Sequence, residues 1–369
     1  MADTIYYVDP DATGTGDGSS YTNAYTSLNA AVNARAATVG AGDRIIFRCQ
    51  SGSGTADTTP VVLPDTLNGL GIVRIEGTET NLGCVWNTDN YRLEIANTRA
   101  FYSVIANHLN LELVNLQINN TIDAEWETCA FFTWTTTWAT QSLLIDRCIF
   151  DLIAGSYRTN TINIDVAQAD APVKVRNSYI RNRSSSTANP SCLADVNGGT
   201  LIYVHNNTFH GYSSASVCRA LEMDATILSC KNNIFYNLSA CITVKGGETI
   251  TDNNNSTNIA QTSSGLTNGN NNRFSQTFTF DGSTLNITSA DAGAKDYGED
   301  LSSDANLAVT EDIRTTARSG SFDIGAYETS GGSTDLEKAF IIGDCLLESL
   351  NPAEFYSAEA IKYDFIFRR

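Results

Sequence analysis

Residues 204–209 read Val-His-Asn-Asn-Thr-Phe, and this six-residue pattern recurs along the middle of the chain. Its positions hold an apolar residue, any residue, Asn or Arg, a small or polar residue, any residue, and finally Phe or Ile. Further copies stand at 145–150 (Ile-Asp-Arg-Cys-Ile-Phe), 175–180 (Val-Arg-Asn-Ser-Tyr-Ile) and 230–235 (Cys-Lys-Asn-Asn-Ile-Phe), and a weaker copy stands at 113–118 (Leu-Val-Asn-Leu-Gln-Ile). The copies end at 118, 150, 180, 209 and 235, so the steps between them are 32, 30, 29 and 26 residues. A period of this length indicates a stacked repeat.

The segments between the copies predict strands. They alternate apolar and polar residues over short stretches separated by Asn, Gly and Ser, and none carries a helical stripe. Coils of short strands that stack roughly 4.8 Å apart form a solenoid. We therefore predict an all-β fold, a single-stranded right-handed parallel β-helix. Asn177, Asn206 and Asn232 are expected at one sharp turn of successive coils, in the left-handed conformation that Asn tolerates, with their amides hydrogen-bonded along the stack.

Four regions follow from this interpretation. Residues 1–43 are expected to cap the start of the β-helix and to contain a short amphipathic helix at 28–34. Residues 44–260 form the coils, and 261–329 form the last coils and a closing module. Residues 330–369 are predicted to be a linker followed by a helical and extended attachment or oligomerisation tail.

Two stretches resemble a known group. The opening YYVDPDATGTGDGSSYTNAYTSLNAAVNA, followed by GDRIIF, resembles the N-terminal cap of bacterial and phage pectate-lyase-like β-helix proteins. DIRTTARSGSFDIGAYE at 312–328 resembles the closing motif of many of them. The resemblance spans about residues 4 to 329 and implies the architecture, because this fold serves lyases, hydrolases and non-catalytic virion proteins alike.

The tail beyond the closing motif is apolar enough to require a partner surface. Its apolar positions fall in a predicted helix and in the last residues of the chain: Leu336, Phe340, Ile341, Leu347, Tyr363, Phe365 and Phe367. The tail would dock on its own β-helix, or on sister chains (a trimer) or on another protein.

Composition and charge exclude several classes of function. A net charge of −18 with 23 basic residues argues against nucleic-acid binding, and no apolar run is long enough to cross a membrane. The start shows no signal peptide, so we expect synthesis in a host cytoplasm and a location in the virion. Nine cysteines without a CxxC pair predict buried thiols, and three histidines are too scattered for a zinc site, so no metal centre is expected from them.

One offset within the repeat predicts a candidate site. Asp165, Asp195 and Asp224 each follow a pattern copy by fifteen residues, and Lys245 follows the matching strand of the next coil. Stacked carboxylates would suit a glycosidase, or a lyase if a Ca²⁺ ion occupied the ladder and Lys245 or Arg219 acted as base. Trp134 and Trp138 would stack on a sugar. The alternative interpretation is a solvated row of turn-capping aspartates without catalytic function.

Two functions remain open. The first is a non-enzymatic bacteriophage virion protein, a capsid decoration (cement) protein or spike, whose tail docks on phage capsid or tail proteins or on sister chains. The second is a tailspike-type depolymerase that cuts a bacterial surface polysaccharide with the three aspartates.

Overall fold

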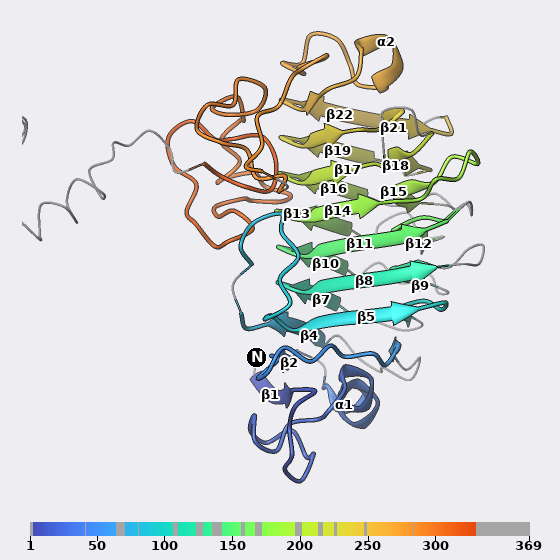
Figure 1. Ribbon diagram of the computed structural model, residues 1–369, viewed down its shortest axis with the longest axis vertical. Helices are drawn as coiled ribbons and strands as arrows, with labels where there is room; N and C mark the ends of the chain where they lie inside the picture. The colour runs from blue at the N-terminus through green and yellow to red at the C-terminus, as the bar shows by residue number, and fades with distance from the viewer. Residues whose placement is uncertain are drawn as a thin grey trace, which may run out of the picture. The chain divides into compact units, whose positions relative to one another are not determined.

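The computed structural model is a parallel β-helix built from three sheets (Figure 1). It describes residues 3–40, 42–63, 71–79, 81–105, 110–122, 128–134, 142–155, 159–166, 172–195, 201–212, 217–224, 227–246, 249–282 and 284–329. These residues lie in one compact unit, Met1–Thr329. The predicted fold class is confirmed.

Each central coil contributes one strand to each sheet, and the coils at the two ends contribute fewer. The first sheet holds β1 (Asp3–Val8), β2 (Arg44–Cys49), β4 (Ile72–Gly77), β7 (Asn110–Val114), β10 (Ser142–Asp146), β13 (Pro172–Arg176), β16 (Leu201–His205), β19 (Ile227–Lys231) and β22 (Thr249–Asn253). The second holds β5 (Arg92–Ala96), β8 (Gln117–Ile122), β11 (Ile149–Ala154), β14 (Tyr179–Asn182), β17 (Thr208–His210), β20 (Ile234–Tyr236) and β23 (Ser256–Thr257). The third holds β3 (Val61–Leu63), β6 (Phe101–Ile105), β9 (Ala130–Trp134), β12 (Ile162–Val166), β15 (Ser191–Asp195), β18 (Arg219–Met223) and β21 (Ala240–Val244).

The six-residue pattern joins the first sheet to the second. Its apolar first position points inward, so Val204 pairs with Val175 and Cys230 in neighbouring coils. Its last position also points inward, where the rings of Phe209 and Phe235 stack with centroids 5.4 Å apart. Burying one such side chain fully stabilises the fold by about 1.5–3 kcal/mol. The repeat in the sequence is therefore the repeat of the core.

The third position of the pattern adopts the left-handed conformation that the sequence predicts. Its φ is 51° at Asn177, 53° at Asn206 and 56° at Asn232. The expected amide ladder, however, runs mainly through the next position, which points into the core. There the Nδ2 atoms of Asn207, Asn233 and Asn255 each donate to the Oδ1 atom of the next amide, ending at Asn272, over 3.0–3.1 Å.

The ends of the solenoid are covered by different means. At the start, α1 (Leu28–Arg35) packs Leu28, Ala31 and Val32 into the core (Figure 1). The 3₁₀ turn η1 (Ala36–Thr38) that follows it buries Ala36. The predicted helix is confirmed, and Ser27 caps it by accepting a hydrogen bond from the amide of Ala30. At the other end stands the one-turn helix α2 (Gln261–Ser264).

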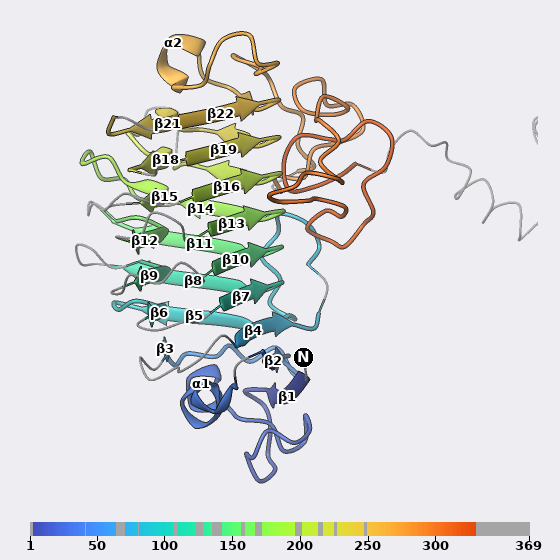
Figure 2. The ribbon, with the colours of Figure 1, turned by 180° about the vertical axis from the view of Figure 1, so that it is seen from behind.

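Residues 281–329, which we call the closing segment, fold back along the turns between the first and second sheets (Figures 1 and 2). Asn286 Oδ1 accepts a hydrogen bond from the amide of Cys84, 202 residues earlier in the chain. Lys231 Nζ lies 2.9 Å from Asp304 Oδ2. The segment thus contacts coils from both halves of the β-helix.

The eight cysteines in the described part of the chain are all buried and free, as predicted. Within the same part, no helix is long and apolar enough to cross a membrane. All seven apolar residues predicted to form the attachment tail lie outside the described residues: Leu336, Phe340, Ile341, Leu347, Tyr363, Phe365 and Phe367.

Candidate functional site

The third sheet carries the aspartates that the sequence singled out. Asp165 lies near the end of β12, in register with Thr133 of β9, and its side chain is on the outward side of the sheet. Asp224 follows β18 directly, and its Oδ2 atom lies 3.4 Å from the Nζ atom of Lys245. The side chains of Asp224 and Lys245 are 36% and 43% exposed, so this ion pair is open to solvent.

Asp195 does not join the predicted ladder. It pairs with Ile164 rather than with Asp165, and it is fully buried. The coil between Ile180 and Asp195 is one residue longer than the corresponding span from Phe150, and a shift of one residue turns a strand side chain to the opposite face. The prediction of three aspartates in one outward row is therefore wrong in register.

On the outward face of the third sheet, where Asp195 was expected, the carboxylate is instead that of Glu222 on β18. Its Oε2 atom accepts a hydrogen bond of 2.9 Å from Ser191 Oγ, and its Oε1 atom lies 3.4 Å from Arg219 Nη1. Arg219, considered above as a lyase base, is thus paired with a carboxylate. The fifteen-residue offset missed Glu222, although the alternation of the strand Arg-Ala-Leu-Glu-Met places its glutamate on the outward face.

The prediction that Trp134 and Trp138 stack on a sugar concerns side chains that lie outside the described part of the structure. The backbone of Trp134 ends β9, but its side chain and all of Trp138 lie outside what the structure describes. Among the described residues, no three His, Cys, Asp or Glu side chains gather as a metal site would require. A Ca²⁺ ion on this sheet stays a prediction.

Burial keeps two histidines of the β-helix, His205 and His210, neutral. Burial lowers the pKa of His205 to about 4 and that of His210 to about 3. Both ring nitrogens of His205 are within hydrogen-bond distance of oxygens, the carbonyl of Leu307 and the hydroxyl of Ser229. His205 thus helps to fix the closing segment on the coils.

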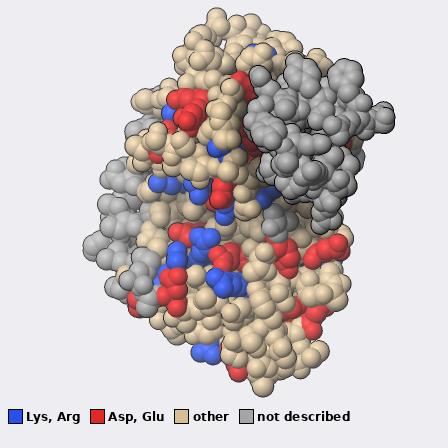
Figure 3. Space-filling model, turned by 90° about the vertical axis from the view of Figure 1, so that its left-hand side faces the viewer, with Lys and Arg blue, Asp and Glu red and all other residues tan. Residues whose placement is uncertain are grey.

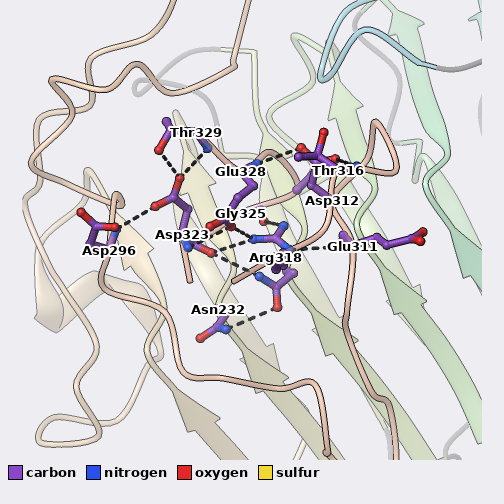
Figure 4. A network of polar contacts seen from close by, with 12 residues as sticks. Asn232, Asp296, Glu311, Asp312, Thr316, Arg318, Asp323, Gly325, Glu328 and Thr329 are labelled. Atoms are coloured by element: carbon purple, nitrogen blue, oxygen red, sulfur yellow. Dashed lines mark hydrogen bonds and ion pairs between the residues drawn. The ribbon is translucent and has the colours of Figure 1, made fainter. Parts of the chain in front are cut away.

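A dense polar network lies in the closing segment (Figure 4). The guanidinium of Arg318 is fully buried and bonds the Glu328 carboxylate at 2.5 Å, the carbonyl of Gly325 at 2.7 Å and the carbonyl of Asp323 at 3.1 Å. The Asp323 carboxylate in turn accepts the amide and the hydroxyl of Thr329, each over 2.6 Å. Each buried charge has a partner, as burial demands.

Burial changes the protonation of this network. It raises the pKa of Glu328 to about 7, against the opposing effect of Arg318, and it also raises the pKa of Asp323. Asp312 adds a third carboxylate, which accepts the amide hydrogen of Glu328 at 3.1 Å. The network lies inside the closing segment rather than on an open face, so its first effect is on stability.

Gly325 shows why this segment needs a glycine. Its φ is +103°, and a Cβ atom would lie 2.6 Å from Ile234 Cδ1. Its amide donates to the carbonyl of Asn232 over 2.7 Å, so the backbone of the segment is pressed directly onto a turn of the β-helix. Ile324 and Ala326 on either side are fully buried.

Comparison with known proteins adds little. No family model and no curated protein matches the sequence. Among solved structures, the chain is similar to the crystal structure of pectate lyase Pel9A, with 12% sequence identity, a TM-score of 0.27, and coverage of 89% of this chain and 97% of that chain.

Proposed function

We propose that this protein is a non-enzymatic structural protein of a bacteriophage virion, a capsid decoration protein or a spike, that displays its β-helix outward. The observation that carries the proposal is the bracing of the solenoid by its closing segment. Arg147 on an early turn is paired with Glu311 at 2.6 Å, and Asn232 on a late turn donates to the carbonyl of Glu299 at 2.7 Å. A rod braced along its length suits a protein exposed on a particle.

The third sheet also favours a structural role. Glu222 is tied to Ser191 and Arg219, and Asp224 is tied to Lys245. Asp195 faces the core, so the carboxylates do not stand in the single outward row that the sequence suggested.

In this proposal, residues 330–369 attach the β-helix to capsid or tail proteins or hold a homotrimer together. Light scattering during size-exclusion chromatography should compare the full chain with a chain that ends at Ser330. A trimer that becomes a monomer would favour a spike, and a monomer in both cases would favour a cement protein. The protein should also be present in purified virions, and the chain that ends at Ser330 should be absent from them. Retention of the shortened chain on the particles would refute the attachment role.

The second candidate is a depolymerase for a bacterial surface polysaccharide. The solvent-open Asp224–Lys245 pair, with Asp165 on the same face, favours it. The test is release of reducing ends or unsaturated sugars from a panel of bacterial polysaccharides. Activity that falls at least about a hundredfold in Asp224→Asn would establish this candidate and overturn the non-enzymatic proposal.

A further inference from the structure

A polar hollow of about 460 Å³ lies on the outward face of the first sheet, near its N-terminal end. Its size falls within the range of small-molecule sites. Residues from several parts of the chain meet there, and its charged and aromatic lining consists of Tyr7, Tyr21, Arg48, Arg74, Glu76 and Arg147. Thr315 of the closing segment completes the rim.

The arginines that line the hollow differ in how fully they are paired. The lining holds three arginines and one glutamate. Two of the arginines also pair with carboxylates beyond the lining, Arg74 with Glu112 at 3.0 Å and Arg147 with Glu311 at 2.6 Å. Figure 3 shows basic and acidic side chains intermixed on the side of the molecule that carries the closing segment. Among the described residues, Arg48 pairs only with Glu76, so its guanidinium is the group that can attract an anionic ligand at short range.

Glu76 orients two of the arginines rather than blocking them. Its Oε1 atom accepts from Arg48 Nε at 2.9 Å, and its Oε2 atom accepts from Arg74 Nε at 2.5 Å. Among the described residues, Arg48 donates only through Nε, and its side chain is 38% exposed. The two terminal nitrogens of Arg48 are therefore held in place and available. Such paired donors match the oxygens of a carboxylate or a phosphate.

Arg147 stands where neighbouring coils have asparagine. It occupies the left-handed turn position with φ 55°, which Asn115 and Asn177 fill in the adjacent coils. This conformation costs an arginine roughly 1–2 kcal/mol. Its Nε atom is buried without a hydrogen-bond partner among the described residues, which adds to the cost. Asparagine would adopt this backbone conformation at lower cost, so the presence of an arginine must be explained by the contacts of its side chain. It binds Glu311 and brings a third guanidinium to the hollow.

The N-terminal cap supplies aromatic surface. The rings of Tyr7 and Tyr21 meet edge to face, with centroids 4.6 Å apart, and both line the hollow. A fixed aromatic pair beside convergent donors is the usual composition of a site for a small ligand with both an apolar face and polar groups. A sugar ring has this character.

We propose that this hollow binds an anionic sugar, that is, a sugar ring carrying a carboxylate or a phosphate. Arg48 binds the charged group, Arg74 and Arg147 border it, and the tyrosines pack against the ring. The site is on the first sheet and uses none of the aspartates of the third sheet, so it is independent of whether the protein is a virion component or a depolymerase.

The test is isothermal titration calorimetry of the full chain with glucuronic acid, glucose 6-phosphate and glucose. We expect at least one of the two anions to bind with a dissociation constant at or below about 1 mM, and glucose to bind at least about tenfold more weakly. The anion that binds identifies the charged group as carboxylate or phosphate. Added salt should weaken binding.

Two matched variants locate the site. Arg48→Gln should weaken anion binding by about tenfold or more. Arg44→Gln should leave it unchanged, because Arg44 lies on the same face of β2 but pairs with Asp3 outside the hollow. Circular dichroism melting should show that both variants are folded. Absence of anion binding, or equal binding by Arg48→Gln and the wild type, would overturn the proposal.

Discussion

Asn233 and its neighbour Asn232 show that asparagine has two different structural roles in a turn between the first and second sheets. The two residues form one turn, but their amides have different tasks. Asn232 takes the left-handed conformation and reaches outward to the closing segment. Asn233 is fully buried, donates to the carbonyls of Val204 and Lys231, and accepts the amide of Asn207. The inner amide thus satisfies three backbone groups in two neighbouring coils.

We predict that Asn233→Ala lowers the free energy of unfolding by about 3 kcal/mol, because it leaves buried backbone groups without partners. Urea denaturation followed by circular dichroism would measure the change. Asn268→Ala is the matched control, since Asn268 is exposed and lies in the same part of the chain. Similar effects of the two substitutions would show that the inner ladder does not stabilise the fold.

At the residue scale, the sequence indicated the turns but not the facing of every side chain. Asn at the third pattern position predicted the left-handed turns, since few other residues adopt them. Asp195 was assigned to the wrong face because the loop before it is one residue longer. Loop length is not constrained by the core, so a constant offset cannot be relied on between coils.

The closing segment is the element whose position depends most on a few contacts. It has little regular structure, and the residues that fix it are spread from Asn286 to Thr329. Such an element is stabilised by close packing of its backbone on the β-helix and by buried polar groups, rather than by the hydrogen bonds of a β-sheet.

Gly325→Ala should detach this element locally. A methyl group there would overlap Ile234, and the positive φ adds strain, so we expect a loss of about 2 kcal/mol or more. Gly320→Ala is the control, because Gly320 has φ +75° but nothing within 4 Å of an added Cβ. Limited proteolysis should cleave residues 281–329 faster in Gly325→Ala than in Gly320→Ala. Equal rates would mean that the contact with Ile234 is unimportant.

The sequence could suggest that this element exists but not where it lies. Asp323–Glu328 was expected to close the fold through its resemblance to known closing motifs. The contact of the closing segment with a residue as distant as Cys84, made through Asn286, has no local signal, because it depends on how many coils lie between the two residues.

For the whole molecule, the repeat predicted the architecture because the core itself is repetitive. The strands and their parallel pairing could be inferred from the alternation of apolar and polar residues and from a period near thirty residues. The helix of the cap could be inferred from its own short amphipathic stretch. The arginine-lined hollow could not be inferred, since it joins residues that only the coiling of the chain brings together. Arg147 in an asparagine position was its one signal in the sequence.

The stability of the whole fold should depend on the protonation of Glu328. Because its pKa is raised to about 7 from 4.5, the folded state binds this proton more tightly. That contribution is fully present below about pH 4.5 and is lost as the pH rises through 7. We predict that the wild type loses up to about 3 kcal/mol relative to Glu328→Gln between pH 5 and 8.

The comparison with Glu328→Gln is needed because other groups act in the opposite sense. The lowered pKa values of His205 and His210 make the fold more stable as the pH rises toward 6.5, equally in both proteins. Urea denaturation of the two proteins at pH 5, 6, 7 and 8 gives the difference directly. A difference independent of pH would show that Glu328 does not titrate in this range.

The return of the closing segment to the early coils also sets an order of events during synthesis. Cys84 and Arg147 leave the ribosome long before Asn286 and Glu311, their later partners. The coils must therefore stack while the outer ends of their turns are still uncovered, and the brace arrives only when most of the chain has been made. A ribosome that stalls before residue 281 would leave an unbraced solenoid with an open turn edge, a species on which chaperones and proteases would be expected to act.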